Sequence, residues 1–254
     1  MLEVTVLSIV QGIAEFLPVS SSGHLVIVSH FLDTGDTGMV LDLFLHFGTL
    51  IAVLIYYFSS VRRILRERDA MYVLKILVSS VPAIVVYALF KRQIDGAFED
   101  PHTVGAALMF TGAILLITKY IPSGGGKEVS LFRAFLMGVA QALAILPGVS
   151  RSGMTITAAR AGKVDPARAA EFSFLMSAPL IVGGCLLKFL EMMDKPRLAF
   201  LGEVSLGEAI YGVVVSCIVG LGSLVVLEKI LKGRKFWYFG PYCIIAGLLI
   251  LFLI

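Results

Sequence analysis

Two polar stretches of closely similar sequence lie among apolar residues in this chain, and they hold most of its candidates for chemistry. Residues 11–24 read QGIAEFLPVSSSGH and residues 141–154 read QALAILPGVSRSGM, so a shift of 130 positions aligns them without a gap. The same shift pairs Phe44 with Phe174, so the repeat covers most of each half of the chain. We therefore predict one site that is built from two halves.

The two copies differ at the positions of their most reactive side chains. The first copy has Glu15, Ser21 and His24 where the second has isoleucine, Arg151 and methionine. A carboxylate, a hydroxyl and an imidazole therefore come from one half, and a guanidinium comes from the other. This division predicts that each half contributes different chemistry to the shared site.

The second copy has the composition of an oxyanion-binding loop. Hydroxyl groups lie on both sides of its arginine, at Ser150, Ser152 and Thr155, and Gly148 permits a close approach of the backbone. If a serine caps the following helix, free backbone N–H groups and the helix dipole add attraction for an anion. The planar fork of Arg151 binds phosphate oxygens in bidentate fashion. The alternative is that Arg151 only pairs with the carboxylate of the first copy and holds the halves together.

The first copy supplies the candidates for covalent chemistry. The hydroxyl-rich break and the start of the next helix comprise Ser20, Ser21, Ser22, Gly23 and His24. A serine is a weak nucleophile unless a neighbouring base takes its proton, and histidine suits that role near neutral pH. Ser21 and His24 are within reach of each other, so we predict a serine nucleophile with a histidine base. The simpler alternative is that the serines only break the helix and that His24 has a structural role.

Two oxygen-bearing residues precede this break on one helical face. Gln11 and Glu15 lie four residues apart, so their side chains can share a ligand, and we predict that they hold a divalent cation completed by water. One carboxylate and one amide make a weak metal signal alone. Glu15 is the stronger candidate because an ionisable residue inside a membrane segment is by default a functional one. Asp42 and His46 share another helical face, where a place in the cavity and a structural role are equally compatible with the sequence.

The composition is that of an integral membrane protein. Hydrophobic residues make up 58% of the 254 positions and charged residues only 15%, with a mean hydropathy of +0.93. These values are far from those of a soluble domain. The three cysteines lie in apolar runs without the spacing of a metal site, so we interpret them as packing residues. A net charge of +3 is too small to indicate a nucleic-acid partner.

Hydropathy predicts an all-α membrane protein with six transmembrane helices and two re-entrant helical hairpins. The apolar stretches are residues 41–58, 75–90, 103–121, 169–190, 206–231 and 236–254. The two motifs fall in shorter, broken runs, 1–32 and 131–162, which suit hairpins that enter the membrane partway and return. We therefore predict repeats at 1–121 and 131–254 within one integrated membrane domain, joined by a glycine-rich linker at 124–126. Three crossings in each half would invert the second repeat relative to the first.

The loop charges predict an orientation in the membrane. Lysine and arginine gather in alternate connections, at residues 62–75, 119–133 and 229–235, while the intervening connections are more acidic. The positive-inside rule places these basic connections in the cytoplasm. Both termini of this multi-pass cell-membrane protein should then lie outside.

The two stretches resemble the signature motifs of a known family. QGIAEFLPVSSSGH and LPGVSRSGMT are similar to the (E/Q)xxxE and PGxSRSxxT motifs of the undecaprenyl-diphosphate phosphatase family, of the bacitracin-resistance type. The resemblance runs nearly end to end, and the two motifs together are highly specific. It implies a membrane enzyme that removes the terminal phosphate of a C55 polyprenyl diphosphate and so recycles a lipid carrier for cell-wall synthesis. It also implies a divalent cation, Mg²⁺ or Ca²⁺, and a site that opens to the outer face.

The resemblance assigns roles to residues of this chain. The catalytic set that it implies is Glu15, Ser21, His24 and Arg151. Around the diphosphate we expect Ser20, Ser22, Gly23, Gly148, Ser150, Ser152 and Thr155, with Gln11 and Glu15 at the cation. Many family members have glutamate where this chain has Gln11.

We predict a phosphatase in which Ser21 attacks the terminal phosphorus, His24 takes the serine proton, and Arg151 and the cation stabilise the developing charge. Attack by water or by His24 itself would use the same residues. The alternative class is a transporter or flippase of a phosphorylated polyprenyl lipid, which inverted repeats with a polar central site would also suit. A transporter needs no nucleophile, so the residue types favour the enzyme. The sequence is also compatible with a homo-oligomer.

Overall fold

The chain is helical throughout a computed structural model that describes residues 1–32, 37–98, 100–121, 126–193 and 204–253. Within these ranges the extended pairing is one isolated bridge, between Lys127 and Val164. The helices are α1 (Leu2–Ala14), α2 (Ser21–Leu32), α3 (Thr37–Tyr56), α4 (Phe58–Glu67), α5 (Ala70–Phe98), α6 (Pro101–Ile117), α7 (Leu131–Leu143), α8 (Arg151–Ala161), α9 (Pro166–Met193), α11 (Leu206–Lys232), η1 (Phe236–Tyr238) and α12 (Phe239–Leu253). The all-helical class is confirmed. Two of the three predicted linker glycines lie outside the described residues.

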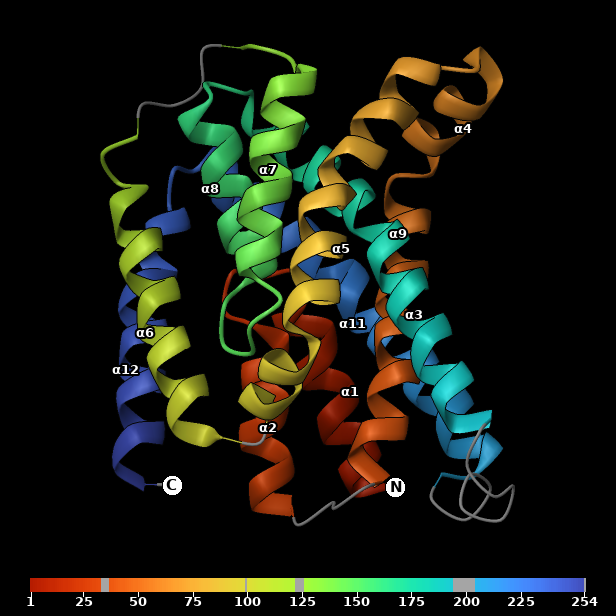
Figure 1. Ribbon diagram of the computed structural model, residues 1–254, viewed down its shortest axis with the longest axis vertical. Coiled ribbons are helices and arrows are strands. Elements are labelled where there is room, and N and C mark those ends of the chain that lie inside the picture. Colours follow the sequence, from red (N-terminus) through yellow and green to blue (C-terminus); the bar gives the residue numbers. More distant parts are fainter. Residues whose placement is uncertain (33–36, 99, 122–125, 194–203, 254) are drawn as a thin grey trace.

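Both motifs interrupt a pair of short helices. The breaks at residues 15–20 and 144–150 separate α1 from α2 and α7 from α8, whose lengths are 13, 12, 13 and 11 residues. A helix of 13 residues is only about 20 Å long, which is less than the ~30 Å core of a bilayer. The two hairpins extend from opposite ends of the molecule, and their breaks lie near its middle (Figure 1).

Other helices are long and apolar enough to cross a membrane. Among the described residues, α5, residues 166–187 of α9, and α11 meet this test singly, and α3 and α4 meet it together across a bend of 70°. The helices α6 and α12 have 17 and 15 residues, somewhat short of the ~20 that a crossing needs. The chain is therefore a multi-pass membrane protein by length and composition.

One predicted connection is helical in the structure. The sequence predicts a loop that includes the arginines of residues 62–68, whereas most of this segment forms α4 in the structure. The segment alternates basic and apolar residues at helical spacing, so its arginines stay exposed while Ile64 is buried. The helix ends at Arg68, which adopts a left-handed conformation with φ of 50°.

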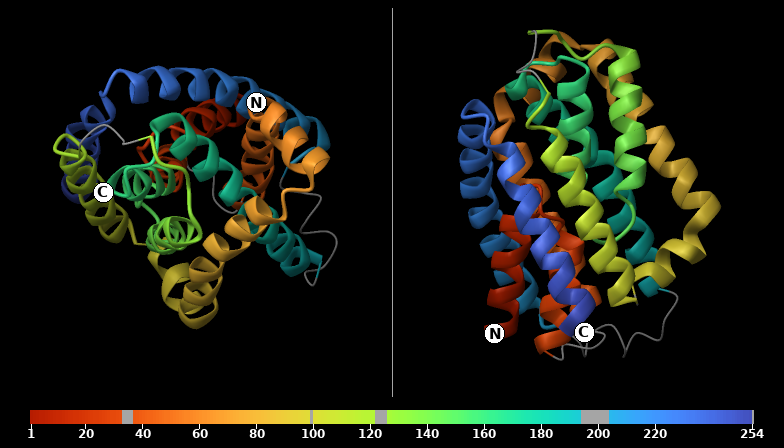
Figure 2. Two further views of the ribbon diagram at one scale, coloured as in Figure 1. Left: turned by 90° about the horizontal axis from the view of Figure 1, so that it is seen from above. Right: turned by 90° about the vertical axis from the view of Figure 1, so that its left-hand side faces the viewer.

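Helices from the two halves pack on each other in a reciprocal pattern. The first hairpin helix of each half contacts the second long helix of the other half, as α1 with α11 and α7 with α5. Figure 2 shows α11 curving past α1. The last helices of the halves, α6 and α12, pack together through glycines. A Cβ added to Gly105 would lie 2.9 Å from the carbonyl oxygen of Gly247, so only small residues permit this approach.

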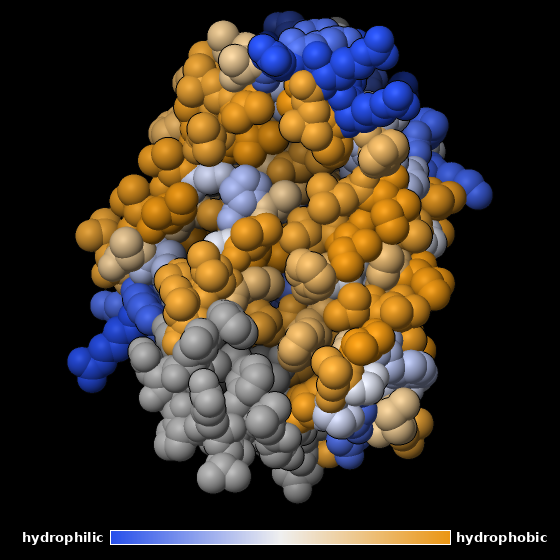
Figure 3. Space-filling view, turned by 90° about the vertical axis from the view of Figure 1, so that its right-hand side faces the viewer, coloured by the Kyte–Doolittle hydropathy of each residue, from blue (hydrophilic) through white to orange (hydrophobic). Residues whose placement is uncertain are grey.

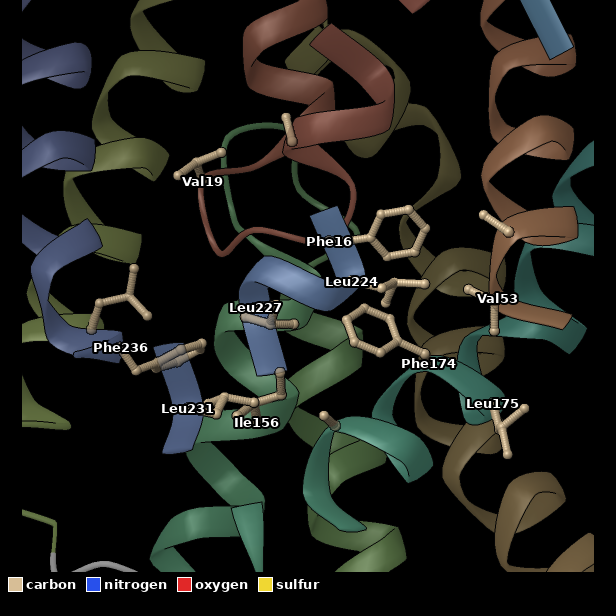
Figure 4. Packing of buried hydrophobic residues seen from close by; sticks show 14 of the residues in the cluster. Phe16, Val19, Val53, Ile156, Phe174, Leu175, Leu224, Leu227, Leu231 and Phe236 are labelled. Carbon is tan, nitrogen blue, oxygen red and sulfur yellow. The ribbon is translucent and has the colours of Figure 1, made fainter. Parts of the chain in front are cut away.

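The largest apolar cluster lies beside the hairpin breaks and fixes their position. Phe16, in the first break, contacts Phe174 of α9 edge-on with a centroid distance of 5.4 Å, and both rings are fully buried. Leu224 of α11 packs with them (Figure 4). Burial of one such aromatic side chain contributes about 1.5–3 kcal/mol relative to exposure. The break is thus held by an apolar core that includes both halves.

Charged and apolar side chains occupy separate zones of the surface. One face shows an apolar middle below a strongly hydrophilic end (Figure 3). The exposed apolar residues of the molecule include Leu77, Val81 and Ile84 of α5. Large exposed apolar zones are costly in water, so the middle zone is the surface that faces lipid. We call the end that carries α4, the start of α7 and η1 the basic end, and both termini lie at the opposite end (Figure 1).

Candidate active site

The two hairpin breaks have matching hydrogen bonds, which explains why each has a serine at the same place. Ser20 Oγ accepts a hydrogen bond from Gly23 N at 3.3 Å, and Ser150 Oγ accepts one from Gly153 N at 3.1 Å. Each serine therefore caps the second helix of its hairpin, as predicted for the second copy. The free N–H groups of two helix starts consequently face the centre of the protein.

The glycines of the breaks permit the two hairpins to touch. A Cβ on Gly23 would lie 3.2 Å from Gly148 Cα, and a Cβ on Gly153 would lie 3.3 Å from Pro18 Cβ. Pro18 and Gly148 correspond under the shift that aligns the motifs, so these contacts are equivalent by the repeat. Gly148 has φ of +91°, a conformation that favours glycine. The carbonyl oxygen of Gly148 accepts a hydrogen bond from Thr111 Oγ1 at 2.9 Å, so α6, a helix outside the hairpins, holds this turn.

Glu15 joins the chemistry of the two halves. One of its carboxylate oxygens, Oε1, accepts a hydrogen bond from Nη2 of Arg151, the first residue of α8. The other, Oε2, accepts from Ser21 Oγ at 2.7 Å and from Gln11 Nε2 at 3.2 Å. Four residues that the sequence singled out thus meet at one carboxylate, and the predicted pairing of Arg151 with Glu15 is present.

Two polar atoms at this carboxylate are buried without a hydrogen-bond partner among the described residues. They are Nη1 of Arg151, a charged donor, and Oε1 of Gln11, an acceptor. A buried polar atom without a partner costs about 1–3 kcal/mol, so such atoms call for an explanation. A donor for an anion and an acceptor for a cation are what a metal-assisted phosphate site requires. The guanidinium also makes a cation–π contact with Phe174, with Cζ 5.7 Å from the ring centroid.

The same atoms test whether a divalent cation fits. The described residues include no group of three histidine, cysteine, aspartate or glutamate side chains that could hold a metal ion. Gln11 Oε1 is nevertheless a free oxygen ligand, and Glu15 provides an adjacent negative charge. Mg²⁺ commonly takes one or two protein oxygens and completes its shell with water and substrate phosphates. The residues present fit a cation of this kind and not one held in a protein cage.

His24 lies in the same break but has other partners than the predicted one. Its Nδ1 is 2.9 Å from Ser20 O, and its Nε2 is 2.6 Å from the hydroxyl of Tyr242. A carbonyl oxygen only accepts, so Nδ1 carries the proton, and Nε2 accepts from Tyr242 when the imidazole is neutral. The rings of His24 and Tyr242 also stack, with centroids 5.7 Å apart. In this arrangement the proton of Ser21 faces Glu15 and not His24.

The remaining predicted hydroxyls make hydrogen bonds within the scaffold. Ser22 Oγ is 3.3 Å from Ser20 Oγ, and Ser152 Oγ is 3.3 Å from Ser150 Oγ, which repeats one contact in both halves. Thr155 Oγ1 donates to Arg151 O at 2.8 Å and lies 2.6 Å from a serine hydroxyl of α9. The contacts of Ser152 and Thr155 hold the helix that carries Arg151, and the contact of Ser22 lies within the first break.

Two residues at the site were not in the predicted set. His46 of α3 places Nε2 at 3.8 Å from Glu15 Oε2, and Tyr242 of α12 binds His24. The sequence indicates His46 as a candidate because it is an ionisable residue in an apolar span. A place in the cavity is one of the two roles that the sequence allows for it. The sequence does not indicate Tyr242, because a tyrosine in the last apolar run has no motif around it. Its contact depends on α12 lying beside the first hairpin.

The fold and the site define a class of helical membrane protein in which two broken hairpins meet at a buried carboxylate and a guanidinium. The family described as Bacitracin resistance protein BacA matches residues 4–249, and the chain belongs to this family. A Salinibacter ruber protein named Undecaprenyl-diphosphatase is 36% identical, with 96% of each chain covered. A Desulfosudis oleivorans protein of the same name is 40% identical, with 95% of this chain and 94% of that protein covered. The family resemblance predicted from the motifs is therefore confirmed.

Proposed function

We propose that this protein is a membrane phosphatase that removes the terminal phosphate of undecaprenyl diphosphate and releases the monophosphate lipid carrier. Relatives that match nearly end to end carry the name of this activity. The observation that carries the proposal is the meeting of Ser21 and Arg151 on the two oxygens of Glu15, with Nη1 of Arg151 free for a phosphate oxygen. This grouping and these names support hydrolysis over the transporter that the fold alone would also suit.

The activity is tested by phosphate release from the purified full chain in detergent, with undecaprenyl diphosphate as substrate. Hydrolysis to the monophosphate and inorganic phosphate supports the proposal. A protein that binds the diphosphate and moves it across a liposome membrane without cleaving it would contradict the proposal and favour the flippase. The comparison with and without EDTA shows whether a divalent cation takes part.

The hydrogen bonds support a serine route with a different proton acceptor from the one predicted. Ser21 Oγ attacks the terminal phosphorus and the bond from phosphorus to the bridging oxygen breaks, so the lipid monophosphate leaves. The serine proton passes to Glu15, to which it is already directed. Water then cleaves the phosphoserine, which restores the hydroxyl and releases inorganic phosphate. Arg151 stabilises charge on the phosphoryl oxygens.

Substrate binding would change the partners of Arg151. In the structure the guanidinium is paired with Glu15, and a bound diphosphate would attract it toward the phosphate oxygens. His24, oriented by Tyr242 and Ser20, remains the candidate for activating the water of the second step or for attacking in place of Ser21.

We propose that Gln11 and Glu15 hold the divalent cation, Mg²⁺ or Ca²⁺. A bound cation would neutralise charge on the diphosphate and so lower the barrier to attack. Gln11 would bind it through Oε1, while its Nε2 keeps the bond to Glu15. This assignment distinguishes Gln11 from the phosphate-binding donors of the site.

Replacing Gln11 by glutamate tests the assignment. A second carboxylate adds an anionic oxygen ligand, so we expect Gln11→Glu to lower the cation concentration for half-maximal rate by about tenfold, the effect of ~1.4 kcal/mol. Mg²⁺ and Ca²⁺ titrations of both proteins measure this. Gln11→Leu, which removes the amide, should raise the requirement. If Gln11→Glu leaves the cation requirement unchanged and raises KM, residue 11 donates to the substrate instead.

We propose six membrane crossings and two re-entrant hairpins, arranged as inverted repeats at 1–121 and 131–254. The reciprocal packing of α1 on α11 and of α7 on α5 supports this arrangement, as does the entry of the hairpins from opposite ends. By the positive-inside rule the basic end faces the cytoplasm. Both termini and the opening of the site would then face outward, in the cell membrane.

Cysteine labelling tests this topology at two exposed positions. Gly96 has no atom within 4 Å of an added Cβ, and Lys232 is exposed near the other end of the molecule. In a chain without its native cysteines, Gly96→Cys should react with a membrane-impermeant maleimide added outside whole cells, and Lys232→Cys should react only after lysis. Labelling of both from the same side would contradict the orientation. Phosphate release by each variant confirms that it is folded.

A further inference from the structure

A second cationic site lies at the basic end, away from the catalytic carboxylate. A hollow of about 330 Å³ is lined by the end of α6, by Arg160 of α8, and by the turn between α11 and α12. Arg160 and Arg151 are nine residues apart on α8, or about 14 Å along the helix at 1.5 Å per residue. The volume is within the range of small-molecule sites, about 300–1,000 Å³. The proposed phosphatase chemistry does not use it.

The lining of this hollow is positively charged and has no acidic residue among its described members. Its cations are Lys119, Arg160 and Arg234. Lys119 lies over the ring of Trp237, with Nζ 4.8 Å from the centroid, so an aromatic face and not a carboxylate accompanies it. Like charges gathered without an anion repel one another, and a bound anion would relieve that repulsion.

Arg160 is the residue that points most directly to a ligand. Only 6% of it is exposed, and its Nε is buried without a hydrogen-bond partner among the described residues. Its Nη2 reaches Thr118 O only at 3.4 Å, and its Cζ lies 6.0 Å from the Phe236 ring centroid. A buried guanidinium with unused donors and no carboxylate partner is costly unless an anion binds it.

We propose that this hollow binds a phosphate group at the cytoplasmic end of the protein, with Arg160 as the buried donor and Lys119 and Arg234 as the outer cations. Arginine forks match phosphate oxygens, and basic pockets between membrane helices on the cytoplasmic side are sites for anionic headgroups. The phosphate belongs either to a lipid headgroup or to a soluble ion, because both present the same oxygens. The site does not depend on the proposed catalytic activity.

Trp237 is the single tryptophan of the chain and lines the hollow, so it reports binding without a label. An anion that draws Lys119 from the indole ring changes its emission. We expect a saturable change when sodium phosphate, or phosphatidic acid in mixed micelles, is added to the full chain in dodecylmaltoside. Sodium chloride at equal ionic strength is the reference. A response to inorganic phosphate assigns a soluble ligand, and a response to phosphatidic acid alone assigns a lipid headgroup.

Charge-removing variants locate the response. We expect Arg160→Gln and Arg234→Gln to raise the apparent Kd about tenfold or more, as for the loss of a charge-assisted hydrogen bond. Lys235→Gln removes an equal charge beside the hollow but not from its lining, and should change Kd less than about twofold. Arg234 is exposed, so its variant remains informative if Arg160→Gln does not fold. Phosphate bound at Arg151 would be unaffected by Arg234→Gln.

Three results would overturn the proposal. One is the lack of a saturable response to either phosphate probe. Another is an equal response to chloride, which would show only screening of surface charge. The third is an apparent Kd that is the same in the Arg234→Gln variant as in the Lys235→Gln variant.

Discussion

Replacement of Ser21 by alanine is expected to lower kcat by about 10³-fold or more while the lipid diphosphate still binds. The hydroxyl makes a 2.7 Å hydrogen bond to Glu15, so it has an acceptor in place before substrate arrives. Loss of a nucleophile affects the transition state far more than the ground state, which separates kcat from substrate affinity. Phosphate release and equilibrium binding of undecaprenyl diphosphate to the same purified variant measure the two effects.

The adjacent serine provides a matched control for this experiment. Ser22 lies in the same helical turn, and its hydroxyl contacts Ser20 at 3.3 Å rather than the carboxylate. We expect Ser22→Ala to lose at most about tenfold in rate, the cost of about one neutral hydrogen bond. If Ser21→Ala retains near-normal turnover, then water or His24 attacks the phosphorus. In that case His24→Ala should be the more damaging change.

The sequence was sufficient to predict the parts of the site that depend on local structure. The serine caps, the helix breaks and the position of Arg151 at a helix start follow from residue types at fixed spacing, and the gapless repeat showed that both breaks belong together. Even the pairing of Arg151 with Glu15 was foreseen as one of two alternatives. In the structure Nη2 makes this pair, and Nη1 has no hydrogen-bond partner among the described residues.

The sequence does not predict contacts between helices that are distant in the chain. The sequence predicts a pair of Ser21 and His24 because they are neighbours on one helix, but in the structure the hydroxyl of Tyr242, from the other half, is hydrogen-bonded to His24 Nε2. Which nitrogen or oxygen faces Ser21 depends on how α1, α2 and α12 lie relative to one another, and hydropathy carries no such information. Likewise, composition predicts the apolar spans but not the bend of 70° between α3 and α4.

Substitution of Arg151 by lysine is expected to reduce phosphate release by about 10²-fold or more, nearly as much as substitution by alanine. In the structure one guanidinium serves two directions, because Nη2 binds Glu15 while Nη1 is free, and the planar group lies over Phe174. A lysine ammonium has the same charge but carries its donors on a single nitrogen, so it cannot reproduce the planar fork with one nitrogen toward the carboxylate and the other toward the phosphate. Steady-state kinetics of Arg151→Lys and Arg151→Ala, with kcat and KM resolved, measure the loss.

The control separates the fork from the stability of the ion pair. Removal of the arginine leaves a buried carboxylate uncompensated, which costs about 3–5 kcal/mol, so Arg151→Ala is also examined with Glu15→Gln in the same chain. Recovery in the double variant of the thermal stability lost in the single variant would show that the loss came from the uncompensated carboxylate. The activity of the double variant decides nothing, because Glu15 is itself the proposed proton acceptor. Arg168→Lys, at an exposed pair with Glu128, should change neither quantity. Substantial activity in Arg151→Lys would mean that charge alone is required, because a point charge would then suffice where the structure presents a fork.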